Sequence, residues 1–217
     1  MSQHSKALAV LALGVAVAVG ALVLTRHVVA VAGEADAGRQ NNVIMAYVAE
    51  KNPQAPIKAF QKFPETLVNE SQRAGLDHCL TLAQAEVESQ LRHDAVGAAG
   101  EIGIFQVKPS TAAIFEGQLG PFRRPEYGKS GIRDLGDLAD PVVGTKFALA
   151  YLRDIRTRKP NIKDALTEYN GGPAGRHPLY YRMVMGAYVE VLERTELKCR
   201  FRAMPKESPV LKLMTRA

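Results

Sequence analysis

The sequence predicts a mostly α-helical domain preceded by an N-terminal transmembrane or signal helix. Three observations lead to this prediction: an apolar run near the N-terminus, apolar residues at helical spacing from Glu65 onward, and no segment with the apolar–polar alternation of a β-strand. The chain has 217 residues, of which 47% are hydrophobic and 23% are charged. This length and composition suit one compact domain with accessory segments, and they exclude wholesale disorder.

The apolar run extends from Ala7 to Leu24 and contains only Ala, Val, Leu and Gly. As a helix it would rise about 27 Å, close to the roughly 30 Å hydrocarbon core of a bilayer. A cleaved signal peptide is the alternative, because Ala30-Val31-Ala32 has the small-x-small pattern of a cleavage site. Residues 1–32 are therefore expected to form a signal anchor or a signal peptide, and in either case the rest of the chain is exported.

Composition divides the remaining chain into three parts. Residues 33–64 are punctuated by Pro and Gly, and we expect a spacer there with a short helix around Val43 to Glu50. Residues 65–199 are expected to form the domain, with a loop over residues 116–136, and residues 200–217 a basic, loose tail. The expected helices of the domain cover Thr66 to Ala74, Cys79 to Leu91, Pro109 to Phe115, Pro141 to Arg156, Ile162 to Tyr169 and Tyr181 to Leu197.

Net charge and the number of cysteines limit which partners and cofactors are expected. The formal charge of +6 favours polyanions, which include nucleic acid, anionic lipid and the bacterial cell wall. No recognised nucleic-acid-binding motif accompanies it, so we expect no nucleic-acid partner. The two cysteines, Cys79 and Cys199, form neither a CxxC pair nor a Cys/His cluster, and we expect no metal and no cofactor. Their spacing leaves open whether they form one disulfide or remain two buried thiols.

Four short motifs follow one another along the chain. They are Glu88-Ser89, Gly100-Glu101-Ile102-Gly103-Ile104-Phe105-Gln106, Pro109-Ser110-Thr111-Ala112 and Tyr169-Asn170-Gly171-Gly172-Pro173. In this order they resemble the soluble-lytic-transglycosylase (SLT) domain of the lysozyme-like superfamily, over roughly residues 65–195. The resemblance implies a lysozyme-like domain that cleaves the MurNAc–GlcNAc glycosidic bond of peptidoglycan without water. The product would carry a 1,6-anhydro end.

A carboxylic acid is the group that such chemistry needs first. Cleavage of a glycosidic bond requires a proton for the departing oxygen, and a desolvated Glu that stays neutral near pH 7 can supply it. Glu86 and Glu88 flank Val87 on the same apolar helix, and helix geometry does not separate them. Gln106 follows Glu88 by 18 positions, which is the interval in the family. The resemblance therefore favours Glu88 as the single general acid and later base.

The resemblance also implies a set of substrate-binding residues, namely Ser89, Gln106, Tyr169, Asn170 and Tyr180. Amide side chains both donate and accept hydrogen bonds, which suits hydroxyl and N-acetyl groups. Tyrosine offers an apolar face together with a hydroxyl. Each of these residues also has an ordinary structural interpretation, as a helix cap or a core aromatic.

Three departures from the family pattern surround the glycine-rich segment. Gly97 stands where the family usually has Ser, Lys108 where Met is common, and Glu101 replaces a small residue. If Glu101 faces the substrate, hydrolysis by water becomes possible, so a lysozyme-like muramidase is the enzyme alternative. A catalytically silent wall-binding module of a secretion, pilus or phage apparatus is the alternative from another class.

The expected setting follows from the export signal and the substrate. We expect a single-pass protein of the bacterial inner membrane, with its domain in the periplasm, or a periplasmic protein released by cleavage near Ala32. The expected partners are peptidoglycan glycan strands and, through the N-terminal helix, the inner membrane. An envelope-spanning protein machine is a further candidate partner.

Overall fold

The computed structural model describes residues 36–129, 131–175, 177–197 and 199. The chain divides into two compact units, Met1–Asn42 and Val43–Ala217. The expected apolar helix from Ala7 to Leu24, the cleavage site after Ala32 and the basic tail 200–217 lie outside the described residues. Within the described ranges, no helix is both long enough and apolar enough to span a membrane.

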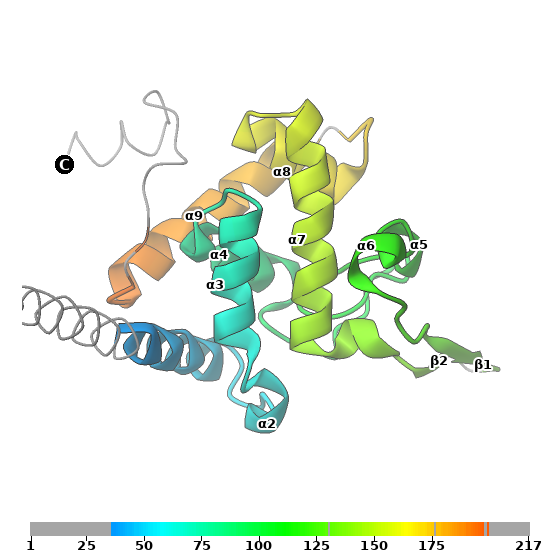
Figure 1. The fold of residues 1–217 in the computed structure, drawn as a ribbon, viewed down its shortest axis with the longest axis horizontal. Helices are drawn as coiled ribbons and strands as arrows, with labels where there is room; N and C mark the ends of the chain where they lie inside the picture. The colour runs from blue at the N-terminus through cyan, green and yellow to red at the C-terminus, as the bar shows by residue number, and fades with distance from the viewer. Residues whose placement is uncertain (1–35, 130, 176, 198, 200–217) are drawn as a thin grey trace, which may run out of the picture. The chain divides into compact units, whose positions relative to one another are not determined.

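Helices make up most of the described chain, as the sequence predicted (Figure 1). Residues 36–51 are helical. The further helices are α2 (Ile57–Phe60), α3 (Phe63–Arg73), α4 (His78–Ser89), α5 (Pro109–Ala113), α6 (Glu116–Leu119), the 3-10 helix η1 (Asp137–Ala139), α7 (Pro141–Arg158), α8 (Ile162–Gly171) and α9 (Pro178–Arg194). All the helices that the sequence predicted are present, with ends displaced by a few residues.

Side-chain caps explain where several of these helices begin. Asp77 Oδ1 accepts a hydrogen bond from Cys79 N at 2.9 Å at the start of α4. Asp140 Oδ1 accepts from the backbone amides of Val142 and Val143 at the start of α7. The first amides of a helix have no partner within the helix, so each cap stabilises its helix by about 1 kcal/mol.

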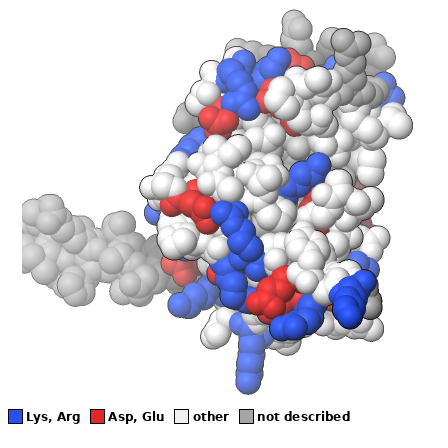
Figure 2. Space-filling view, turned by 90° about the vertical axis from the view of Figure 1, so that its right-hand side faces the viewer, with Lys and Arg blue, Asp and Glu red and all other residues white. Residues whose placement is uncertain are grey.

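The segment 116–136 contains more regular structure than the loop that the sequence predicted. It holds α6 and an antiparallel hairpin of β1 (Glu126–Gly128) and β2 (Gly131–Asp134). Strands of three and four residues are too short to show an alternating pattern, which explains why the prediction was wrong here. The face of the molecule in Figure 2 carries acidic side chains beside basic ones, and ion pairs such as Arg133–Glu126 brace the hairpin.

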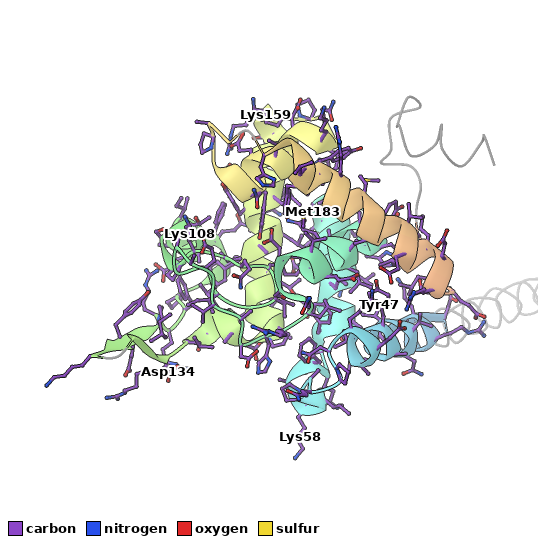
Figure 3. All side chains as sticks on the ribbon, turned by 180° about the vertical axis from the view of Figure 1, so that it is seen from behind. Tyr47, Lys58, Lys108, Asp134, Lys159 and Met183 are labelled. Atoms are coloured by element: carbon purple, nitrogen blue, oxygen red, sulfur yellow. A yellow bond between two sulfur atoms is a disulfide. The ribbon has the colours of Figure 1, made fainter. Side chains whose placement is uncertain are left out.

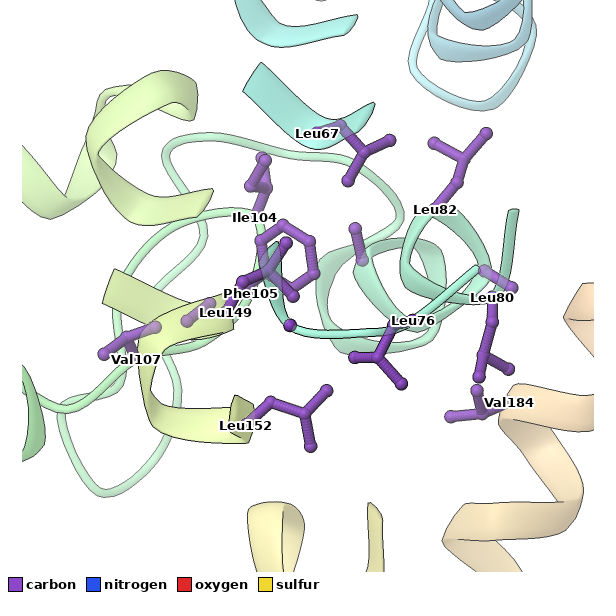
Figure 4. Close-up of a cluster of buried hydrophobic side chains, with 14 of the residues drawn as sticks. Leu67, Leu76, Leu80, Leu82, Ile104, Phe105, Val107, Leu149, Leu152 and Val184 are labelled. Atoms are coloured by element: carbon purple, nitrogen blue, oxygen red, sulfur yellow. The ribbon is translucent and has the colours of Figure 1, made fainter. Parts of the chain in front are cut away.

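The core of the second unit forms around α4. Every residue of α4 from His78 to Ala85 is buried, and the helix packs against α3 and α9. Helix α7 in turn packs against α3 and α8 (Figure 1). In the close-up of Figure 4, Leu67 of α3, Leu82 of α4 and Phe105 of the following loop lie in one apolar cluster. A helix enclosed in this way holds its last turn in a fixed position, and that turn carries Glu88.

The segment expected as a spacer, 33–64, supplies part of this core from Ile44 onward. Ile44, Tyr47 and Val48 are at most 2% exposed, and Phe60 is fully buried. Tyr47, labelled in Figure 3, reaches α4 from the helix over residues 36–51, because its hydroxyl donates to Glu86 Oε2 at 2.5 Å. Apolar residues at these intervals form one helix face, but the Pro and Gly residues of the segment obscured that pattern. Packing therefore begins before Glu65.

A disulfide joins Cys79, at the start of α4, to Cys199, which follows α9. The two Cα atoms are 5.7 Å apart, within the usual range for a disulfide. The alternative that the sequence left open is thereby resolved in favour of one bond between residues separated by 120 positions. The bond ties the helix that bears Glu88 to the end of the domain.

Candidate active site

A cavity of about 380 Å³ opens beside the last turn of α4. The loop between α4 and α5 forms one wall, and α7 and α8 form the other. Several of its side chains come from the sequence motifs. The lining residues are Glu88, Glu101, Gln106, Val107, Lys108, Thr111, Tyr151, Tyr169, Asn170, Gly171 and Gly172.

Glu88 is the partly buried carboxyl of this cavity. Burial raises its pKa from 4.5 to about 7; the hydrogen bond from Tyr180 opposes this rise, and the negative charge of Glu101 adds to it. The hydroxyl of Tyr180 donates a short hydrogen bond to Glu88 Oε1. Burial and the nearby Glu88 carboxylate keep the pKa of Tyr180 well above its usual value, so this hydroxyl remains a donor. A carboxyl with these surroundings is able to carry a proton at neutral pH.

Glu86 has different surroundings, although it lies only two residues away. Its carboxylate accepts a hydrogen bond from Tyr47 Oη at 2.5 Å and pairs with Lys51 Nζ at 2.7 Å. Glu86 is not among the residues that line the cavity. Tertiary structure thus separates the two carboxylates that helix geometry left equivalent, since Glu86 is held in an ion pair and Glu88 faces the cavity.

The loop that carries the glycine-rich motif is held in a fixed shape. Gly103 has φ +80°, and a Cβ at this position would overlap the backbone carbonyl of Leu138, so only glycine fits. Gln106 also has a positive φ of 47°. Its Nε2 donates to the carbonyls of Ala95 at 3.1 Å and Gly103 at 2.9 Å. These bonds use both amide protons within the loop, so Gln106 Oε1 is left to face other groups.

The predicted binding residues occupy different positions. Gln106, Tyr169 and Asn170 line the cavity together with Glu88. Tyr169 Oη donates to the carbonyl of Phe105 at 2.9 Å, which joins α8 to the glycine-rich loop. Tyr180 is buried and reaches Glu88 from α9 without lining the cavity.

Ser89 lies away from the cavity. It is buried, and its Oγ donates to the carbonyls of Ile104 at 2.9 Å and Ala85 at 3.3 Å. The structure therefore shows Ser89 fastening the end of α4 to the loop rather than facing the space beside Glu88.

Some lining residues were not among the sequence candidates. Tyr151 of α7 lines the cavity, and its ring centroid is 5.3 Å from that of Tyr169. Tyr151 lies in a long helix with many apolar residues, where an aromatic resembles core, so no sequence signal marked it. Thr111 lies within the Pro109-Ser110-Thr111-Ala112 motif, and that motif was the available signal.

One cluster of potential metal-ligand atoms is present among the described residues. Asp77, Cys79 and Cys199 bring their ligand atoms within 4.8 Å of one another. The two sulfur atoms form the disulfide, however, so they are not thiolates that would bind a metal. Asp77 is also engaged, because it caps α4 and accepts a hydrogen bond from Tyr188 Oη at 2.8 Å.

The transglycosylase SLT domain family matches residues 65–177, just over half of the 217 residues. The chain belongs to the transglycosylase SLT domain family. The match begins within α3, extends past the end of α8 and includes every lining residue of the cavity. The prediction of a mostly helical, lysozyme-like SLT domain is confirmed.

Comparison with curated proteins found no match. Two solved structures of SLT-type enzymes are similar over part of their length. An inactive mutant of the lytic transglycosylase Slt from Pseudomonas aeruginosa is 22% identical, with a TM-score of 0.48, over 64% of this chain and 26% of that protein. The 70 kDa soluble lytic transglycosylase from Escherichia coli is 20% identical, with a TM-score of 0.40, over 58% of this chain and 19% of that protein. The chain thus spans about a quarter or less of either protein.

Proposed function

We propose that this protein is a peptidoglycan lytic transglycosylase in which Glu88 is the general acid and base. One observation carries the proposal: the cavity of an SLT domain holds a carboxyl whose pKa is raised to about 7. A glycosidic oxygen leaves only when it receives a proton, and an acid with a pKa near the working pH is suited to provide it.

The geometry supports different roles for the two carboxyl oxygens of Glu88. Tyr180 donates to Oε1, so the acid proton resides on Oε2 and is transferred from there to the glycosidic oxygen. The bond between C1 of the muramic acid and this oxygen then breaks, with assistance from the N-acetyl group. The Tyr180 hydroxyl stabilises the carboxylate that Glu88 has become.

The second half of the reaction restores the acid. The 6-hydroxyl of the same sugar attacks C1 and passes its proton to the Glu88 carboxylate. A bond between C1 and O6 forms, so the product carries a 1,6-anhydro ring and no water is consumed. Glu101 is not needed as a nucleophile in this sequence.

The side chains that face Glu88 across the cavity are proposed to bind the sugar. Asn170 is exposed there and offers both a donor and an acceptor. Tyr169 lines the cavity beside Tyr151, and together they present aromatic surface to a sugar ring. Gln106 contributes its carbonyl oxygen. Ser89 and Tyr180 act on the site indirectly, Ser89 by holding the loop and Tyr180 by holding Glu88.

A muramidase is the second candidate, because the cavity contains a second carboxylate. Glu101 lines the same cavity as Glu88, and a paired carboxylate is what hydrolysis by water commonly uses. Burial raises the pKa of Glu101, but hydrogen bonds from the amides of Glu101 and Ala99 and from Lys108 have the larger, opposite effect. The pKa therefore lies below its usual value, and Glu101 stays ionised. The chemistry of the product distinguishes the two enzymes. A silent wall-binding module would release no product.

The proposed setting is the periplasm, where peptidoglycan lies, with the chain held at the inner membrane by its N-terminal segment or released by cleavage near Ala32. A role within an envelope-spanning machine also belongs to this proposal.

The direct test of the proposed function is to incubate the purified chain with peptidoglycan sacculi. We expect soluble glycan fragments to appear. No release above a heat-inactivated control would contradict an enzymatic function.

A further inference from the structure

A pair of acceptor oxygens meets beside Gly97 on the wall of the cavity. A Cβ at this position would overlap Glu101 Oε2 and would lie 2.7 Å from Gln106 Oε1. Both side chains line the cavity. The absence of a side chain at residue 97 therefore allows two acceptors, from Glu101 and Gln106, to converge on one place.

Neighbouring groups fix the direction of both oxygens. Lys108 Nζ pairs with Glu101 Oε1 at 3.3 Å, and Ala99 N donates to Glu101 Oε2 at 2.9 Å. Gln106 directs its NH₂ group at two loop carbonyls, so its oxygen is on the opposite side. Both oxygens lie within 2.7 Å of the point that a Cβ of residue 97 would occupy, so a donor near this point can reach both acceptors. The carboxylate is only partly covered, since 23% of the Glu101 side chain is exposed.

We propose that Gly97, Glu101, Gln106 and Lys108 form a binding site for a hydrogen-bond donor of the substrate, either an N-acetyl N–H or a sugar hydroxyl. Lys108 holds the carboxylate, and Gly97 leaves room for it. A carboxylate and an amide oxygen accept hydrogen bonds and donate none, so this site suits the N-acetyl N–H or a hydroxyl of the sugar. The inference rests on the proposed function only in the choice of ligand, because it concerns binding rather than cleavage.

The test uses binding, so that cleavage plays no part in it. The probe is the uncharged β-1,4-linked tetramer of N-acetylglucosamine, titrated by calorimetry into the Glu88→Gln chain. We expect Glu101→Ala in this background to raise the Kd about tenfold, since a charge-assisted hydrogen bond contributes at least that factor. Glu101→Gln keeps an acceptor without the charge and should show a smaller rise. Glu126→Ala, which removes an equal charge on the hairpin away from the cavity, should leave the Kd unchanged.

The glycine supplies a second arm of the same experiment. Gly97→Ala should weaken binding in the parent, because its Cβ displaces the Glu101 carboxylate and crowds Gln106 Oε1, and should weaken it less when Glu101 is already Ala and only the contact with Gln106 remains. Thermal unfolding of each variant separates this role from a structural one, because a purely structural Glu101 would lower Tm and leave the Kd of the folded chain unchanged. A Kd within twofold of the parent for Glu101→Ala, additive effects at positions 97 and 101, or no tetramer binding by the parent would overturn the inference. The release of fragments from sacculi tests the proposed function independently.

Discussion

Two carboxylates of α4 acquire different properties from residues far away in the sequence. Glu86 meets Tyr47 and Lys51 from the helix over residues 36–51, whereas Glu88 meets Tyr180 of α9. Lys51 pairs with Glu86 away from the cavity, whereas Glu88 lines the cavity and burial raises its pKa. At the scale of single residues, this difference assigns the proposed acid to Glu88.

Glu88→Gln should reduce the release of fragments from sacculi by about 10²–10⁴-fold, because glutamine keeps the shape and has no acid proton to give. Glu86→Gln is the matched control on the same helix, and we expect it to retain most of the activity. Initial rates of both variants, with circular dichroism to verify folding, measure the effect. Activity that survives in Glu88→Gln and disappears in Glu86→Gln would refute the assignment.

The pH dependence of cleavage should report the ionisation of Glu88. Activity requires the protonated form, so kcat/KM should fall as pH rises through about 7. The hydrogen bond from Tyr180 favours the ionised form and lowers this pKa. Tyr180→Phe should therefore move the alkaline limb to higher pH while lowering kcat.

Tyr188→Phe is the control for that profile, because its hydroxyl donates to Asp77 rather than to Glu88. The alkaline limb of this variant should coincide with that of the parent protein. A limb that moves to lower pH in Tyr180→Phe would show that Tyr180 does not stabilise the carboxylate.

At the scale of elements, the long helices were predictable from the sequence. The short strands, and the helix face that lies in a Pro- and Gly-containing segment, were not. Helices α3, α4, α7, α8 and α9 have apolar residues at helical spacing, bounded by caps and prolines. The hairpin of β1 and β2 is too short for a periodicity to appear. The buried face of residues 44–48 was hidden by the composition of the segment around it.

The helix over residues 36–51 is expected to be an integral part of the domain. A chain that begins at Glu65 loses Ile44, Tyr47, Val48, Phe60 and Phe63, all at most 2% exposed. Burial of each large apolar side chain contributes about 1.5–3 kcal/mol, so their combined loss is comparable to the whole stability of an ordinary domain. We expect this truncated chain to be unfolded by circular dichroism, and a chain that begins at residue 36 to unfold cooperatively. A cooperative transition in the shorter chain would contradict this account.

At the scale of the whole molecule, contacts between distant segments decided what the sequence left open. The family motifs predicted a set of site residues, of which Gln106, Tyr169 and Asn170 line the cavity with Glu88. The proximity of Glu101 to Gly97 and Lys108 and the pairing of Cys79 with Cys199 depend on tertiary distances. Sequence spacing contains no such distances, so neither feature was predictable from it.

The disulfide should stabilise the whole domain. It closes a loop across 120 positions, for which the chain-entropy account gives an upper value of about 4–5 kcal/mol. Reduction should therefore lower Tm by on the order of 10 °C. The Cys79→Ala/Cys199→Ala variant should show the lower Tm with and without reductant. Two reactive thiols in unreduced, denatured protein would disprove the bond.

The central claim is a single-acid cleavage that consumes no water, and the fragment ends test it most directly. Mass spectrometry of muropeptides released from purified sacculi distinguishes an anhydro end from a reducing end, because the former is lighter by one water molecule. The account predicts 1,6-anhydro ends from the wild-type protein and from Glu101→Gln, and none from Glu88→Gln. Reducing ends from the wild-type protein would contradict it and would identify the enzyme as a muramidase.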